Sequence, residues 1–144
     1  RFGIPEIDIG ITPGWGGTQR MGRYVGRRAI REMILLGTIL NAQQAKEVQL
    51  VNKIVPADKL DVAVNTLVEV LLAKSPEILK LGKFIIQKGL EADLITGLGF
   101  EVLSAAATTA TSPRKEGTIS FSQKTPLWKD RRKRVAAYYS QYPW

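Results

Sequence analysis

The opening segment, RFGIPEIDIGITPGWGGTQRMGRYVG, restricts the fold of this chain more than any other stretch. Two prolines, Pro5 and Pro13, and several glycines interrupt its apolar first half. Glycines adopt backbone conformations that other residues avoid and let the main chain approach another group closely. We therefore expect an extended segment, then a turn with exposed backbone, then a helix over residues 18–25.

Within this segment the carboxylate of Glu6 has apolar sequence neighbours, which are Phe2, Ile4, Ile7, Ile9 and Ile11. Burial disfavours the charged form of a carboxyl group, so an enclosed Glu6 would be poised both to donate and to accept a proton. On an extended segment Asp8 would face the same side and strengthen this effect. The alternative is a solvated surface glutamate before an ordinary strand–turn–helix junction.

The glycine turn adds a second feature of a possible site. The first N–H groups of a helix have no partner inside the helix, so they can hold a water molecule or an anionic atom. A glycine-rich turn is a weak motif when it stands alone. Together with the apolar surroundings of Glu6, the glycine turn indicates one side of an active site.

Over its whole length the segment resembles a motif of the crotonase family, the enoyl-CoA hydratases and isomerases. The family pattern is F-G-x-P-E-x-x-x-G-x-x-P-G-x-G-G-T-Q-R-L-x-R-x-x-G, and this chain departs from it mainly at Met21. The resemblance continues through AIREMILLGTILNAQQAKEVQLVNKIVP and ends near EGTISFSQKTPLW. It covers about residues 1–129.

The resemblance implies an α/β fold, the C-terminal portion of a crotonase-like spiral, mainly helical with a few short strands. Residues 1–56 would end the spiral core and carry the catalytic glutamate and the glycine turn. Residues 57–128 would form a C-terminal helical region for trimerisation and CoA capping, and residues 129–144 a basic, aromatic tail. The chain would be the C-terminal part of a longer protein that forms homotrimers or dimers of trimers.

Family roles pass to the positions that match the motifs. Glu6 would be the general acid/base, and the backbone N–H of Gly14 would help to hold the catalytic water. Trp15 would shape the acyl pocket, Phe121 would border it, and Lys124 would reach the adenine–phosphate end of CoA. From residue type alone, Phe121 would be a core residue and Lys124 a solvated one.

The resemblance also implies an activity: addition of water to a 2-enoyl-CoA through an enolate intermediate. The CoA thioester is the substrate, and neither a cofactor nor a metal is implied. A second catalytic carboxylate and both oxyanion-hole N–H groups would precede this chain, so these residues alone would be inactive. Open alternatives are an isomerase, a dienoyl-CoA hydratase, a thioester hydrolase, a carbon–carbon lyase and an RNA-binding family member.

Composition narrows the remaining possibilities. The chain has no cysteine and no histidine, which excludes thiol catalysis, disulfides, His-based triads and Cys/His zinc sites within it. Hydrophobic residues make up 44% and charged residues 24%, as in a globular protein, and no apolar run is long enough to span a membrane. The net charge of +8 favours anionic partners. We expect a cytoplasmic protein, with the mitochondrial matrix as the alternative.

Local signals predict the remaining elements. The expected helices cover residues 27–36, ended by Gly37, then 42–48, 58–74, 75–89 and 94–111, with a short strand over 50–55. Asn41 would cap one helix in a capping box with Gln44, while the caps of later helices would be Asp58, Ser75 and Ser112. Gln49 stands where the family has glycine, at a position that favours a left-handed backbone. Apolar stripes on the long helices are expected to pack into the core.

The tail, KDRRKRVAAYYSQYPW, combines basic and aromatic residues. Such a combination can bind single-stranded nucleic acid. It can also form a solvated helix end followed by aromatic residues that pack on the protein or on a neighbouring subunit. We favour packing.

Overall fold

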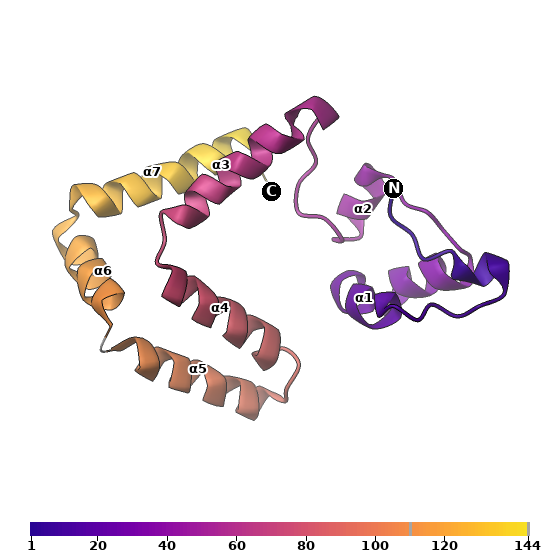
Figure 1. The fold of residues 1–144 in the computed structure, drawn as a ribbon, viewed down its shortest axis with the longest axis horizontal. Helices are drawn as coiled ribbons and strands as arrows, with labels where there is room; N and C mark the ends of the chain where they lie inside the picture. The colour runs from indigo at the N-terminus through magenta and orange to yellow at the C-terminus, as the bar shows by residue number, and fades with distance from the viewer. Residues whose placement is uncertain (110, 144) are drawn as a thin grey trace. The chain divides into compact units, whose positions relative to one another are not determined.

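In a computed structural model, which describes residues 1–109 and 111–143, the chain forms two compact units. The first comprises Arg1–Asp58 and the second Lys59–Tyr142 (Figure 1). Each unit is described by itself. Ala110, in the expected helix over 94–111, and Trp144, in the tail, lie outside the described residues.

The described residues are mainly helical. In chain order the elements are η1 (Glu6–Ile9), α1 (Gly17–Leu35), α2 (Ala42–Glu47), η2 (Ala57–Lys59), α3 (Leu60–Leu72), α4 (Pro76–Gly89), α5 (Leu94–Thr109), α6 (Ser112–Gln123) and α7 (Pro126–Gln141), where η marks a short 3-10 helix. Strand pairing within the described residues is limited to an antiparallel bridge between Phe2 and Leu40. The strand expected over residues 50–55 is therefore absent, because no partner segment pairs with it there.

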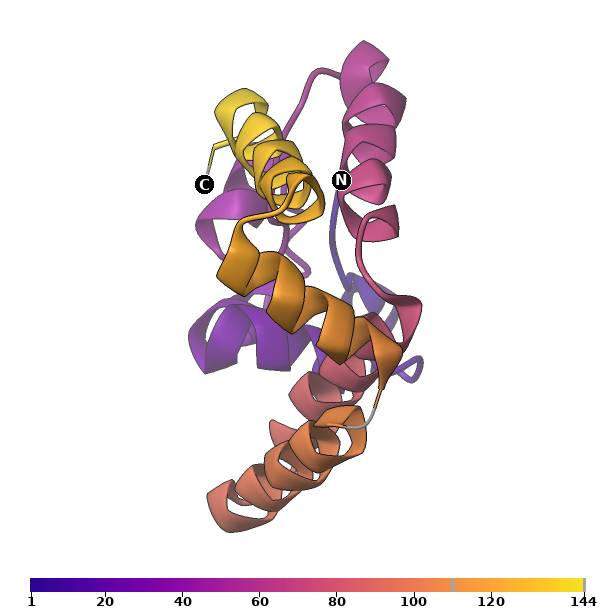
Figure 2. The same ribbon diagram turned by 90° about the vertical axis from the view of Figure 1, so that its left-hand side faces the viewer.

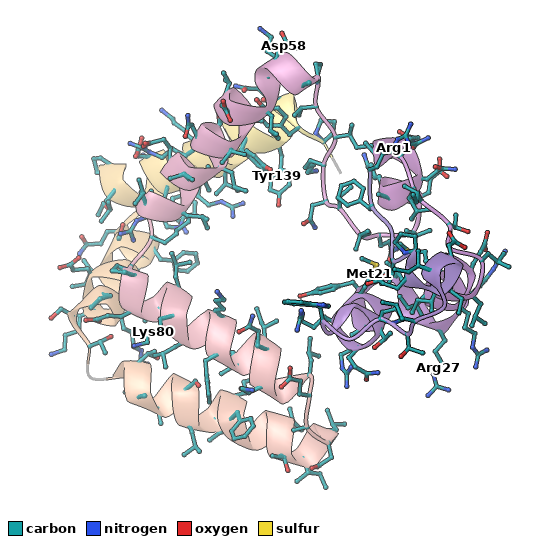
Figure 3. All side chains as sticks on the ribbon, turned by 45° about the vertical axis from the view of Figure 1, so that its right-hand side comes forward. Arg1, Met21, Arg27, Asp58, Lys80 and Tyr139 are labelled. Carbon is teal, nitrogen blue, oxygen red and sulfur yellow. The ribbon has the colours of Figure 1, made fainter. Side chains whose placement is uncertain are left out.

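The first unit has a small buried core made by Met33, Leu40 and Ala45. Partly buried side chains pack against it, namely Phe2, Met21, Val48, Leu50 and Val51. Figure 3 shows Met21 among the side chains of this unit, whereas Arg27 points away from it. The Phe2–Leu40 bridge, with N–H···O distances of 2.9 and 2.7 Å, ties the start of the chain to this core.

Helix α1 consists of two helical runs that meet at Gly26. This glycine has φ 76° and ψ 168°, which interrupts the helical backbone. The interruption matches the separate helices predicted over residues 18–25 and 27–36. Gly37, with φ 62°, follows the end of α1 as expected.

The capping box predicted at the start of α2 is confirmed. The side chain of Asn41 accepts the backbone N–H of Gln44, and the side chain of Gln44 accepts that of Asn41, both at 2.9 Å. Each bond satisfies a backbone donor that the helix leaves without an internal partner. This cap sets where the chain turns after Leu40, a member of the buried core.

Gln49 adopts the left-handed backbone that its position predicts, with φ 62°. A residue with a Cβ pays about 1 kcal/mol for this conformation. We therefore expect Gln49→Gly to raise the free energy of unfolding by up to about 1 kcal/mol. Chemical denaturation followed by circular dichroism measures the change.

Gln43→Gly is the matched control, because Gln43 lies inside α2. Glycine there should lower the free energy of unfolding by about 0.5 kcal/mol. Equal effects of the two substitutions would contradict the assignment of strain to Gln49.

The second unit contains an antiparallel pair, α4 and α5, which lie side by side in Figures 1 and 2. Gly89 and Gly97 meet where these helices cross. A Cβ on Gly97 would lie only 3.0 Å from the carbonyl oxygen of Gly89, so glycine is needed for this approach. Phe84 and Phe100 also pack edge to face across the pair, with ring centroids 5.8 Å apart.

The tail forms most of α7, which packs against α3. Tyr138 is buried and its ring contacts those of Tyr139 and Tyr142. Arg134 of α7 lies 3.8 Å from the carboxylate of Glu69 in α3. The packing that we favoured for the tail is thus what the described residues show.

Three features expected from residue 58 onward are wrong. Asp58 falls in η2, so Lys59 precedes α3, and Thr111 rather than Ser112 precedes α6. The apolar stripes of α3 and α4 are largely exposed, with Leu60, Val64 and Ile86 as examples. Since α3 is covered mainly by α7 and α4 mainly by α5, much of their apolar surface meets no neighbour among the described residues of this unit.

Within the described residues no single helix is long and apolar enough to cross a membrane. Helices α5 and α6, which are bent by 85° at their junction, reach the required length and apolar character only when they are taken together.

Candidate functional site

Glu6 opens a 3-10 turn, not the extended segment that the sequence predicted. Pro5 already has a turn-like backbone, with φ −88° and ψ 17°, and Gly10 closes the turn with φ 76°. Successive residues of a 3-10 helix are about 120° apart, so Asp8 does not face the same side as Glu6. The carboxylate of Asp8 lies against Gly37 instead.

The surroundings of Glu6 are less apolar than expected, because Ile7, Ile9 and Ile11 are exposed. Ile4 is the buried member of the predicted group, at 5% exposure. The Glu6 side chain is nevertheless half-buried, and its Oε2 atom is out of contact with solvent and has no hydrogen-bond partner among the described residues. A buried acceptor without a partner costs free energy, which makes it a candidate for a ligand or a proton.

The glycine turn packs directly against the segment that carries Glu6. A Cβ on Gly17 would lie 2.9 Å from Cδ1 of Ile4, so glycine allows Ile4 to pack on the start of α1. Gly16, which precedes α1, has φ 83° and favours glycine for its backbone. These contacts bring the start of α1 close to the Glu6 turn.

Gly14 and Trp15 form the open part of this turn. A Cβ on Gly14 would meet no atom of the described residues within 4 Å, so packing within the chain does not require glycine there. The side chain of Trp15 is 91% exposed, while its carbonyl oxygen accepts a 2.6 Å hydrogen bond from Arg20. Arg20 therefore holds the backbone of the turn and leaves Gly14 and Trp15 accessible.

The other two predicted site residues lie at the corner between α6 and α7, in the second unit. Phe121 is 58% exposed, so its expectation as a core residue is wrong. Lys124 is exposed, and its ammonium lies 3.7 Å from the centroid of the Phe121 ring. The structure thus groups Phe121 with Lys124, and Glu6 with the glycine turn.

Sequence reasoning missed Trp128 and Arg20 as members of these groups. The ring of Trp128 lies 4.4 Å from the Lys124 ammonium and meets the Phe121 ring edge to face at 6.0 Å. The sequence did contain a signal for Trp128: Lys124 has an aromatic residue on either side of it in the sequence, and Pro126 marks a break between two helices there.

A cavity of about 850 Å³ lies elsewhere in the second unit. Its lining includes Lys74, Ile78, Arg114 and Arg131, and none of the predicted site residues. Burial, together with the charges of Arg131 and Arg132, lowers the pKa of Lys74 below its ordinary value. The lining also carries Glu77 and Glu116, so the cavity holds charges of both signs and is separate from the motif residues.

Comparison with known proteins gives consistent similarities. Residues 1–131 match the family model for enoyl-CoA hydratase/isomerase. The chain is 36% identical to the short-chain-enoyl-CoA hydratase of Clostridioides difficile over 121 residues, which are 84% of this chain and 78% of that protein. It is 40% identical to the 2,3-dehydroadipyl-CoA hydratase of Escherichia coli over 133 residues, 91% of this chain and 52% of that protein.

Among solved structures, the enoyl-CoA hydratase of Bacillus anthracis superposes with a TM-score of 0.82 at 35% identity. The match covers 85% of this chain and 47% of that one. The chain thus spans about half the length of this structure and of the Escherichia coli protein.

Proposed function

The chain belongs to the enoyl-CoA hydratase/isomerase family, and from this premise we propose that the whole protein adds water across the double bond of a 2-enoyl-CoA. Relatives named as hydratases favour this reaction over isomerisation. The substrate is the CoA thioester itself, and we propose no further cofactor. The observation that carries the proposal is the buried, unpartnered Oε2 of Glu6 beside a glycine turn.

In the proposed reaction Glu6 serves as general acid/base. Its carboxylate takes a proton from the water whose oxygen bonds to the β-carbon, and the electrons of the double bond move to form the thioester enolate. A carboxyl group then returns a proton to the α-carbon. A second carboxylate, from the part of the protein that precedes this chain, shares these proton transfers, and two N–H donors from that part stabilise the enolate oxygen.

The glycine turn positions the water and the acyl group in this proposal. The backbone N–H of Gly14 holds the water, and a residue without a Cβ lets the ligand approach the main chain. Trp15 forms part of the acyl pocket, which agrees with its exposure in the chain by itself. The hydrogen bond from the Arg20 side chain to the carbonyl of Trp15 fixes the backbone of the turn from Trp15 to Arg20.

The helical region has two proposed roles. Lys124 binds the phosphate groups at the adenine end of CoA, and Phe121 borders the substrate. The exposed apolar stripes of α3 and α4 pack against the rest of the domain and against neighbouring subunits in a trimer or a dimer of trimers.

Crotonyl-CoA tests the proposal. We expect the whole protein to hydrate it, seen as loss of the enoyl absorbance and formation of 3-hydroxybutyryl-CoA by mass spectrometry. The 144-residue chain alone should be inactive, because the second carboxylate and the enolate donors lie outside it. A product with a shifted double bond and no added water would indicate an isomerase. Hydration by the 144-residue chain alone would contradict the proposal that the second carboxylate and the enolate donors lie outside it.

A further inference from the structure

We propose that Trp128 is a positioning residue for Lys124. Together with Phe121 it forms an aromatic cradle (Phe121 and Trp128) that holds the Lys124 ammonium where it meets a phosphate group of CoA. The inference rests on the proposed function, because it takes a CoA thioester as the substrate.

Three distances define the cradle. The ammonium of Lys124 lies 3.7 Å from the centroid of the Phe121 ring and 4.4 Å from that of Trp128. The rings meet edge to face, with centroids 6.0 Å apart and planes at 71°. Ring faces attract cations within about 6 Å, and tryptophan does so most strongly. Trp128 therefore holds the charged end of Lys124 from a second side.

The backbone beneath the cradle is fixed as well. Lys124 has a left-handed backbone, with φ 52° and ψ 43°, a conformation that residues with a Cβ seldom adopt. Ser120 and Thr125 secure the corner: their hydroxyl oxygens are 2.7 Å apart, and the Thr125 N–H donates to the Ser120 carbonyl at 3.1 Å. These two contacts hold the backbone of Lys124 in its left-handed conformation and so fix where its side chain starts.

The ammonium remains available to an anion. No ion pair of the described residues includes Lys124. A lysine has three N–H donors, and the two rings cover only part of its ammonium. Holding a flexible side chain in place before binding reduces the entropy lost when a phosphate binds. Loss of Trp128 should therefore weaken substrate binding and leave the chemical step unchanged.

Steady-state kinetics of the whole protein can test this with two thioesters. Crotonyl-CoA carries the adenine phosphates, whereas crotonyl-pantetheine lacks them. We expect Trp128→Leu to raise KM for crotonyl-CoA about 3- to 10-fold at unchanged kcat. Neither parameter should change for crotonyl-pantetheine. Lys124→Met should behave in the same way. The double variant should resemble Lys124→Met alone, because both substitutions remove the same interaction, that between the Lys124 ammonium and a CoA phosphate.

Trp128→Phe is the conservative variant, which retains a ring and should give an intermediate KM even if Trp128→Leu fails to fold. A raised KM for Lys124→Met with no change for either Trp128 variant would overturn the inference and leave the proposed function intact. Equal losses with both thioesters would also overturn it, since Trp128 would then act through the fold. No effect of Lys124→Met would refute the proposed role of Lys124 and the inference with it.

Discussion

Replacing Glu6 with glutamine in the whole protein is expected to lower kcat for crotonyl-CoA hydration by about 10²–10⁴-fold. Glutamine matches glutamate in size, but its amide neither takes a proton from water nor delivers one to carbon. Because the shape of the site is kept, KM should change by less than about threefold. Stopped-flow or steady-state kinetics on the pure variant measures both parameters.

Asp8→Asn provides the control, since both acids belong to η1. Asp8 is exposed and lies against Gly37, so its replacement should leave kcat within about threefold of the unmodified protein. Full turnover by the Glu6 variant would remove Glu6 from the mechanism. Equal losses in both variants would instead indicate that the turn itself had been disturbed.

Several features of the fold that depend on neighbouring residues could be predicted from the sequence, although the caps expected at Asp58 and Ser112 were wrong. The capping box of Asn41 and Gln44 needs only two side chains three positions apart. Ser75, before Pro76, caps α4 as expected and accepts the N–H of Ile78. The left-handed backbone of Gln49 likewise follows from its place after a helix.

Features that depend on distant partners could not be predicted in the same way. A strand forms only where another segment pairs with it, so residues 50–55 read as a strand but do not form one. The apolar stripes of α3 and α4 indicate burial, yet many of their side chains are exposed in the part of the chain that the structure describes. Periodicity predicts which face of a helix is apolar, but it does not say what packs against that face.

The candidate site likewise has features that the local sequence predicts and features that depend on the folded chain. The motif singled out Glu6 and the glycine turn as a candidate site, and the structure brings these two features together. The 3-10 backbone at Glu6 was missed because alternating apolar residues also fit an extended segment. Trp128 was missed because its contact with Lys124 depends on the turn between α6 and α7.

Met33→Ala is expected to lower the free energy of unfolding of the first unit by about 2–5 kcal/mol. The Met33 side chain is 1% exposed and lies at the centre of the small buried core. Truncation removes its apolar contacts and leaves a cavity, and a unit of this size has few other buried side chains to compensate. Denaturant titration of the chain, followed by circular dichroism, gives the change.

Met33→Ala also tests whether the buried core supports the turn that carries Glu6. Phe2 and Met21, which precede and follow the Glu6 turn, both pack against the Met33 core, so a loosened core should also loosen that turn. Leu35→Ala is the matched control, because Leu35 lies on the same helix but is 65% exposed; its effect should stay within about 0.5 kcal/mol. Similar losses for both would mean that Met33 does not organise the unit. A loss confined to Met33→Ala, with reduced turnover in the whole protein, would show that this core supports the Glu6 turn.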